Sequence, residues 1–313
     1  MRSGAEEFLT QPFRWPEVLL SLQSIRTKIH QHRPGDNHGR IITIFSNKGG
    51  VGATTIATNL AVTLASRKQT SVCVVDLVLR FGCVAGFLNL EPIYPISDLA
   101  GNSRQVDLML LEGSLIKHSS GVRVLAEPSR STEASGITPS DIARILDALA
   151  QSFDFIIVDV PKEFDDTAFV ALEKADAIFL VAEMNVPALR SLHRGIEFFE
   201  GLGMESKIRL ILNRYVKNKL ISPESVEKTL GVKVLWSLPT DYPVVITALN
   251  QGLSLQESDP KSEIARSFQG LADVVLDLFS VTHDQKSGAQ GKREGILTRL
   301  LSHSLPDLWE AEA

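Results

Sequence analysis

The chain has 313 residues, of which 44% are hydrophobic and 22% charged, so it can form one large globular domain with appendages or two small domains. Its net charge of -5 gives no support for broad electrostatic binding of nucleic acid. No apolar run approaches the roughly 20 residues of a membrane span, and the N-terminus lacks the apolar core of a signal peptide, so we expect a cytoplasmic protein.

The N-terminal 33 residues differ in pattern from the rest of the chain. Apolar residues recur at steps of three and four, which predicts an amphipathic helix from Glu17 to about Ile29. A polar stretch containing Pro34 and Gly35 follows and is typical of a linker. A segment this short cannot bury a core of its own, so we expect it to be mobile or docked on the main domain, and a simple N-terminal arm is the alternative.

From residue 40 onward, apolar strand patterns alternate with helix patterns. This alternation predicts an α/β fold of βαβ units, with a doubly wound, mostly parallel sheet between two layers of helices. Most of the strand patterns are near-continuous runs of Ile, Val and Leu, as expected for strands buried on both faces. The predicted strands are 41–46, 71–76, 122–126, 154–160, 176–183, 207–213 and 233–237, and the predicted helices are 53–66, 139–152, 165–174, 186–202, 222–230, 242–251 and 262–281.

A glycine-rich loop, residues 48–55 (KGGVGATT), separates the first predicted strand from the first predicted helix. This context is typical of a phosphate-binding loop, because glycines allow backbone N–H groups to face inward toward a phosphate. The helix adds unpaired N–H donors and the positive end of its dipole. Thr54 occupies the position of a magnesium-binding hydroxyl, whereas Ala53 stands where the motif has a lysine. The loop therefore suits phosphates but lacks its usual cation.

Polar residues at the carboxyl ends of the other strands are further candidates, because ligands of open α/β sheets bind beyond those ends. Asp76 and Asp159 each end an apolar run. An aspartate beside a phosphate loop can order Mg²⁺ through water. Asn213 ends a later predicted strand, and its amide can both donate to and accept from an adenine edge.

The glycine-rich loop resembles the deviant Walker A loop of the ParA/MinD family, usually KGGVGKTT, at seven of its eight positions. In that family the first lysine, here Lys48, reaches across a dimer interface to the nucleotide of the partner subunit. The resemblance implies a MinD-like P-loop NTPase of the SIMIBI class that uses ATP and Mg²⁺ and forms a homodimer through its nucleotide face. The positions that it assigns to nucleotide binding are Lys48, Gly49, Gly50, Val51, Gly52, Ala53, Thr54, Thr55, Asn213, Arg214, Pro239 and Asp241.

The metal-binding and water-orienting positions of the family are matched only in part. After the second strand the family has Asp-x-Asp, whose second carboxylate orients the attacking water, but here the pair is Asp76 and Val78. Asp159 matches the Walker B aspartate. The resemblance therefore assigns Mg²⁺, partly through water, to Thr54, Asp76 and Asp159, and catalysis to Lys48 with the two aspartates. Because the loop lysine and the second carboxylate are both missing, we expect very slow hydrolysis.

Within the family, the chain looks most like the CpaE/TadZ branch. Residues 76–92 read DLVLRFGCVAGFLNLEP and are similar to the usual DLDLQFGDVALFLDLEP of that branch. Proteins of this branch localise and help to assemble type IV pilus machinery of the Flp/Tad kind. The resemblance implies that pilus or secretion assembly proteins are partners, with a location at a cell pole or at the inner face of the membrane.

The same branch is joined to receiver-like domains, and residues 4–29 resemble the last strand and helix of a receiver. We therefore expect a receiver-like C-terminal remnant at 1–33, a linker at 34–40, a P-loop domain at 41–282, and a linker with an amphipathic tail at 283–313. Segment 292–305 of this tail carries leucines on one helical face and basic flanks, and acidic residues follow it. Membrane contact, docking of a partner and a packed or disordered tail all remain open for it.

Two other functions fit the sequence. The chain could be an active MinD- or ParA-like ATPase that positions division, flagellar or DNA cargo, but Ala53 and Val78 argue against turnover. It could also be a nucleotide-free pseudo-NTPase that serves only as an interaction module.

Overall fold

The computed structural model describes residues 38–100, 108–217 and 221–284. The predicted helix from Glu17, the receiver-like segment and the amphipathic tail lie outside these residues. The chain divides into two compact units, residues 1–272 and 273–313. The first unit holds the whole sheet, and the described part of the second continues the last helix as far as Asp284.

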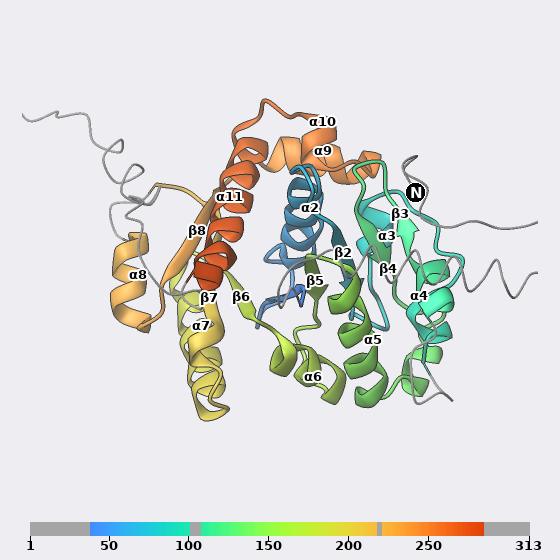
Figure 1. The fold of residues 1–313 in the computed structure, drawn as a ribbon. Coiled ribbons are helices and arrows are strands. Elements are labelled where there is room, and N and C mark those ends of the chain that lie inside the picture. Colours follow the sequence, from blue (N-terminus) through green and yellow to red (C-terminus); the bar gives the residue numbers. More distant parts are fainter. Residues whose placement is uncertain (1–37, 101–107, 218–220, 285–313) are drawn as a thin grey trace, which may run out of the picture. The chain divides into compact units, whose positions relative to one another are not determined.

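The described residues form one eight-stranded sheet in the order β3-β4-β2-β5-β1-β6-β7-β8 (Figure 1). Neighbouring strands are parallel except for the pair β3 and β4 at one edge, which is antiparallel. The mostly parallel, doubly wound sheet expected from the sequence is therefore confirmed. The strands are β1 (Arg40–Phe45), β2 (Val72–Asp76), β3 (Ile116–Lys117), β4 (Arg123–Leu125), β5 (Phe155–Asp159), β6 (Ala177–Glu183), β7 (Ile208–Tyr215) and β8 (Val234–Pro239).

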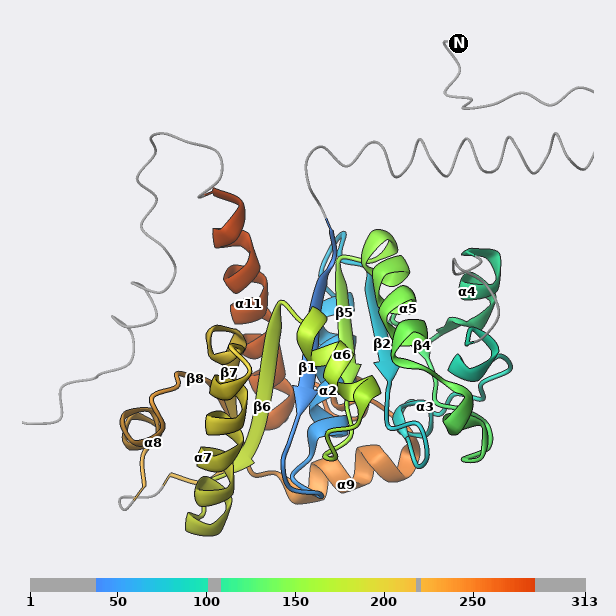
Figure 2. The same ribbon diagram turned by 90° about the horizontal axis from the view of Figure 1, so that it is seen from below.

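Helices cover both faces of this sheet. Helix α2 packs on β1, β2 and β5 on one face, and α5, α6 and α7 lie on the opposite face (Figure 2). Among the described helices, none is both long enough and apolar enough to cross a bilayer. The helices are α2 (Ala53–Ala65), α3 (Val84–Phe87), α4 (Leu108–Ser114), α5 (Pro139–Ser152), α6 (Asp166–Lys174), α7 (Val186–Gly201), α8 (Pro223–Leu230), α9 (Tyr242–Gln251), α10 (Leu255–Ser258) and α11 (Glu263–Asp284).

Local sequence signals explain the element boundaries that the sequence predicts best. Helix α5 begins after Thr138, whose hydroxyl accepts from the Asp141 N–H while the Asp141 carboxylate accepts from the Thr138 N–H. This capping box, with Pro139 at the first helical position, fixes the start of the helix. Helix α9 ends at Gly252, which has a φ of 63°. Glycine adopts this left-handed conformation without strain, so it ends a helix well.

Short elements and the ends of β7 and β8 are among the features that differ from the prediction. Helices α3 and α10 have four residues each and β3 has two, so they are too short to show a periodicity; α4 also carries no clear pattern. Strand β7 continues to Tyr215, so the expectation that Asn213 ends this strand is wrong. Strand β8 likewise extends to Pro239 because its pairing with β7 continues to the register partners Tyr215 and Pro239.

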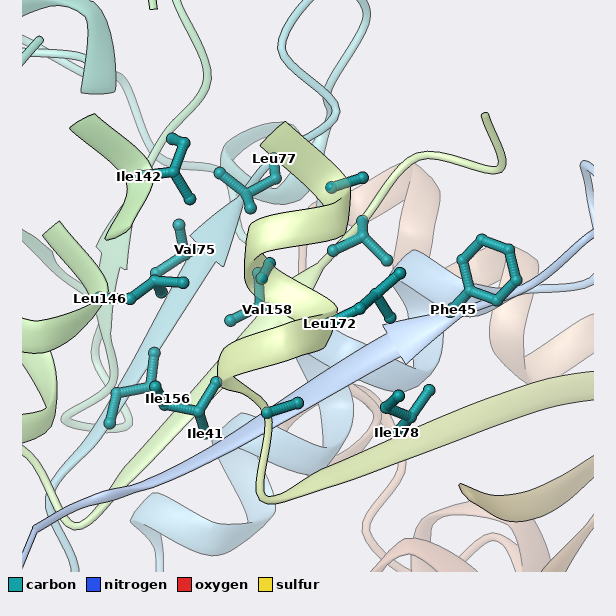
Figure 3. Packing of buried hydrophobic residues seen from close by; sticks show 14 of the residues in the cluster. Ile41, Phe45, Val75, Leu77, Ile142, Leu146, Ile156, Val158, Leu172 and Ile178 are labelled. Atoms are coloured by element: carbon teal, nitrogen blue, oxygen red, sulfur yellow. The ribbon is translucent and has the colours of Figure 1, made fainter. Parts of the chain in front are cut away.

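The core on the face of α5, α6 and α7 is built from alternate residues of parallel strands. Side chains of β1, β2, β5 and β6 meet helix side chains there (Figure 3). The residues at the centre of this cluster include Ile41, Phe45, Val75, Leu77, Ile142, Leu146, Ile156, Val158, Leu172 and Ile178. Because strand side chains alternate between faces, the intervening residues of β5 point to the face of α2, which buries the central strands on both sides.

We expect Ile157→Ala to lower the free energy of unfolding by about 2–5 kcal/mol, because Ile157 is fully buried in the central strand β5 and truncation leaves a cavity. The matched control is Ile93→Ala, at a position that is 77% exposed. The control should stay within about 0.5 kcal/mol of the wild type. Urea-induced unfolding followed by circular dichroism measures both, and equal losses would contradict this account of the core.

Candidate functional site

The glycine-rich loop between β1 and α2 contains two glycines with a positive φ. Gly50 has a φ of 79° and Gly52 a φ of 93°, conformations that glycine adopts without the strain of a side chain. Gly52 is also the N-cap of α2, and no described side chain caps this helix by a hydrogen bond. The N–H groups of its first turn are therefore available to an anion at the positive end of the helix dipole.

Side chains from β7 hold the backbone of this loop. The Asn213 amide donates from Nδ2 to the carbonyl oxygen of Val51 at 2.7 Å, and the Arg214 guanidinium donates from Nη2 to that of Gly50 at 3.1 Å. In a planar trans peptide the C=O and the following N–H point in opposite directions. The N–H groups of Val51 and Gly52 are thus directed away from β7, which orders them for a ligand on the other side of the loop.

Two buried aspartates meet at the carboxyl edge of the sheet. Asp76 and Asp159 end β2 and β5 and are register partners in this parallel pair. Both are almost completely buried. Asp159 accepts a hydrogen bond at 2.6 Å from the Thr54 hydroxyl in the first turn of α2. The three residues assigned to Mg²⁺ from the sequence therefore lie at one edge of the sheet, beside the loop.

Asp76 also organises the chain that follows it. Its carboxylate accepts hydrogen bonds from the backbone N–H groups of Val78, Cys83 and Val84, at 2.9, 2.9 and 3.0 Å. Gly82 packs against the same carboxylate so closely that a Cβ at this position would collide with it. Val78 contributes its backbone N–H to this arrangement.

Burial raises the pKa values of both aspartates, and neighbouring negative charge adds to the effect at Asp76. Burial raises the pKa of Asp159 to about 7, against the opposite effect of the Thr54 hydrogen bond. Burial first, and then the charges of Asp159 and Glu127, hold the pKa of Asp76 well above its usual range. The Oε2 atom of Glu127 is buried and finds no hydrogen-bond partner in the described part of the chain. A divalent cation would relieve this concentration of negative charge.

The donor set fits a magnesium ion that arrives with a nucleotide. Within the described residues, no group of three or more His, Cys, Asp or Glu side chains could hold a metal ion by itself. Mg²⁺ commonly binds through one or two carboxylates together with substrate phosphates and water. Thr54, Asp76 and Asp159 therefore suit an ion whose remaining ligands are phosphate oxygens, with Glu127 as a further acid nearby.

A cluster of three charged groups flanks the other side of the loop. Glu183, at the end of β6, accepts a hydrogen bond from Arg214 Nη1 at 2.6 Å, and its second oxygen lies 3.9 Å from Lys48 Nζ. Arg214 adopts a positive φ of 52°, which is uncommon for a residue with a side chain. This conformation lets the guanidinium contact Glu183 and the loop carbonyl together.

A cavity of about 390 Å³ opens beside the loop, between α2, β7, β8 and α9. It combines apolar walls with a few polar groups, as small-molecule sites usually do. The structure brings the predicted residues Asn213, Arg214, Pro239 and Asp241 together there with Gly52 and Thr55. The other lining residues are Ile56, Thr240, Tyr242, Val245, Ile246, Leu249, Ile264 and Phe268.

Comparisons with known proteins agree with this geometry. The family model of ParA, described as NUBPL iron-transfer P-loop NTPase, matches residues 37–276. The chain belongs to the ParA family of P-loop NTPases. Its sequence is 27% identical to the septum site-determining protein MinD of Thermotoga maritima over 242 residues, which cover 75% of this chain and 87% of that protein.

Solved structures of ParA-family members share the fold. A ParA family ATPase from Chlorobium tepidum superposes with a TM-score of 0.70 at 26% identity, covering 74% of this chain and 98% of that one. MinD from Pyrococcus horikoshii, solved in complex with Mg-ADP, superposes with a TM-score of 0.67 at 26% identity, covering 78% and 98%. This ParA-family chain therefore has the architecture of relatives that include a nucleotide complex.

Three residues near the site carry little signal in the sequence pattern. Glu127 lies two residues beyond β4, and Cys83 directly precedes the short helix α3. Burial raises the pKa of the Cys83 thiol to about 11. Lys162 follows the Walker B-like segment without any periodicity, and only the structure shows that its side chain lies beside the loop at Gly49.

We expect Gly82→Ala to destabilise the protein by about 1–3 kcal/mol, because the new Cβ would collide with the Asp76 carboxylate, which three N–H groups hold in place. Gly86→Ala is the control four residues away, where a Cβ meets nothing within 4 Å. Since Gly86 lies in α3, alanine there should be neutral or slightly stabilising. Urea unfolding of both variants decides, and equal stabilities would refute the proposed close packing at Gly82.

Proposed function

We propose that this ParA-family protein binds Mg²⁺-ATP at the glycine-rich loop and acts as a nucleotide-gated dimer that localises or assembles other proteins, with very slow hydrolysis. The proposal rests on one observation: the loop keeps the backbone conformation of a phosphate-binding loop, whereas two side chains that the family motif uses are missing. Gly50, Gly52 and the uncapped start of α2 suit phosphates. Ala53 stands at the position of the loop lysine, and Val78 at the position of the water-orienting carboxylate.

The expected effects of the missing lysine and carboxylate on affinity and on rate support nucleotide binding without fast hydrolysis. Removing one charge-assisted hydrogen bond to a phosphate costs about 1.5–3 kcal/mol, which corresponds to an affinity lower by roughly 10- to 150-fold. Backbone N–H groups and Mg²⁺ remain, so binding in the micromolar range is compatible with the site. Hydrolysis suffers more, because a preorganised donor contributes about 10²–10³ in rate, and a second group is missing as well.

The position of Lys48 supports a dimer through the nucleotide face. Its side chain is 53% exposed and its described ion pair is a loose one, 3.9 Å from Glu183. An ion pair of this length with one exposed partner holds the lysine only weakly. Lys48 can therefore leave Glu183 and reach toward a nucleotide held by a second subunit, as the resemblance to the family implies.

A role in assembly of the CpaE/TadZ kind is the finer part of the proposal. It is supported by residues 76–92, whose sequence is similar to that branch. Phe81 in this segment is 83% exposed, and a large apolar side chain in that state suits contact with another protein. Pilus or secretion assembly proteins are therefore the partners we propose, with peripheral attachment to the inner membrane or a cell pole.

The alternative is an active ATPase that positions cargo, like the MinD relatives that the chain resembles. The hydrogen bond between Thr54 and Asp159 favours it, because both Mg²⁺-binding groups of an active site are in place. The rate of ATP hydrolysis by the wild-type protein distinguishes it from the first proposal.

We expect purified protein to bind Mg²⁺-ATP with micromolar affinity and to shift from monomer to dimer on binding. Isothermal titration calorimetry measures the affinity, and light scattering on the same samples measures the mass. Asp159→Ala is the control and should weaken Mg²⁺-dependent binding, because it removes the acceptor of the Thr54 hydroxyl. No heat and no change of mass at millimolar ATP would favour the nucleotide-free interaction module.

We expect the double variant Ala53→Lys/Val78→Asp to hydrolyse ATP at least about 10²-fold faster than the wild type, because it supplies a phosphate donor and a water-orienting carboxylate. Release of inorganic phosphate under single-turnover conditions measures this rate. Fast turnover by the wild type, lost in Asp159→Ala, would instead support the active ATPase.

A further inference from the structure

The segment after β5 brings a lysine to the phosphate loop. Strands β1 and β5 are parallel neighbours with Ile44 opposite Asp159, so both chains leave the sheet side by side. The Val160 N–H donates to the Ile44 carbonyl at 3.3 Å and keeps the start of the segment against β1. Lys162 is the third residue after Asp159, and its Cδ lies 3.8 Å from the point that a Cβ on Gly49 would occupy. The lysine stem therefore lies beside Gly49 at the start of the glycine-rich loop.

The ammonium group of Lys162 is only weakly engaged. Its described ion pair joins Nζ to Glu163 Oε1 at 3.4 Å, and the two side chains are 54% and 68% exposed. Exposed pairs of this kind contribute little. A phosphate carries more charge than a carboxylate and accepts stronger hydrogen bonds. A four-carbon stem with a compact charge can turn from Glu163 to such a ligand without moving the backbone.

Among the described residues, Arg214 and Lys48 are also cations near the loop, and they are less suited to this task. Arg214 donates to both Glu183 and the Gly50 carbonyl, so its guanidinium shapes the loop and is already neutralised by a carboxylate. Lys48 faces the same Glu183, and the proposed dimer directs it toward the nucleotide of a second subunit. Both side chains therefore already face Glu183, whereas the Lys162 stem lies against Gly49 and its ammonium pairs with the exposed Glu163.

We infer that Lys162 supplies, within the same subunit, the cation that the loop lacks at Ala53. The observation behind it is the juxtaposition of an exposed lysine stem with Gly49, next to the Asp159 carboxylate that accepts from Thr54. This inference rests on the proposed function, since it names a group that contacts the phosphates of the bound nucleotide. It implies that Lys162 acts on phosphates and not on the base, and that it acts in a monomer.

The test measures Mg²⁺-ATP binding by calorimetry on the full chain, below the concentration at which it dimerises. Lys162→Met should weaken Mg²⁺-ATP binding by about 10- to 150-fold, the cost of one charge-assisted hydrogen bond. Binding of adenosine, followed by ligand-observed NMR, should not change. Lys117→Met, at an exposed lysine of β3, is the matched control and should bind like the wild type. Adding Ala53→Lys to Lys162→Met should restore at least tenfold of the lost affinity.

Each other outcome has a defined meaning. Wild-type affinity for Mg²⁺-ATP in Lys162→Met overturns this inference and leaves the proposed function standing. An equal loss for ATP and adenosine assigns Lys162 a structural role and also overturns it. Absence of Mg²⁺-ATP binding by the wild type overturns the proposed function itself. Thermal unfolding of each variant checks the fold, and Lys162→Gln replaces the methionine variant if that one is unstable, with the same expected loss.

Discussion

The architecture of the site depends on the burial of two carboxyl groups at the ends of neighbouring parallel strands. Asp76 and Asp159 are register partners, so the sheet itself forces them together. Burying carboxylates is costly unless hydrogen bonds or cations compensate. Here Asp76 accepts hydrogen bonds from backbone N–H groups of the segment after β2. Asp159 accepts a hydrogen bond from the hydroxyl of Thr54 at the start of α2. The conformation of that segment and the attachment of the helix to the sheet both follow from this need.

The backbone cradle explains how a ParA-family chain can lose a loop lysine and keep the shape of the loop. Most of the anion-binding groups are N–H donors, which do not change when a side chain is replaced. Their direction is set by the conformations of the loop glycines and by hydrogen bonds that Asn213 and Arg214 of β7 donate to two loop carbonyl groups. Ala53 therefore lacks the charge of a lysine but leaves the backbone geometry of the loop in place.

The fold could be predicted from the sequence because its long elements carry strong local signals: continuous apolar strands, the capping box at Thr138 and the glycine-rich loop. Helices α3 and α10 and strand β3 could not be predicted, since a few residues show no periodicity. The position of the two aspartates at the carboxyl edge of the sheet could be predicted from the ends of the apolar runs alone. The contacts of Asn213, Arg214 and Lys162 with the loop needed the structure, because they join residues more than 100 positions apart in the chain.

Asn213 links the glycine-rich loop to the cavity beside it. Its amide holds the Val51 carbonyl of the loop, and the same side chain lines the cavity beside β8 and α9. A group that enters the cavity and competes for this amide would release the loop, and a group that orders the loop would fix the amide at the wall of the cavity. Occupancy of the two regions would then be coupled through this one side chain. The free energies of occupying them would not be additive.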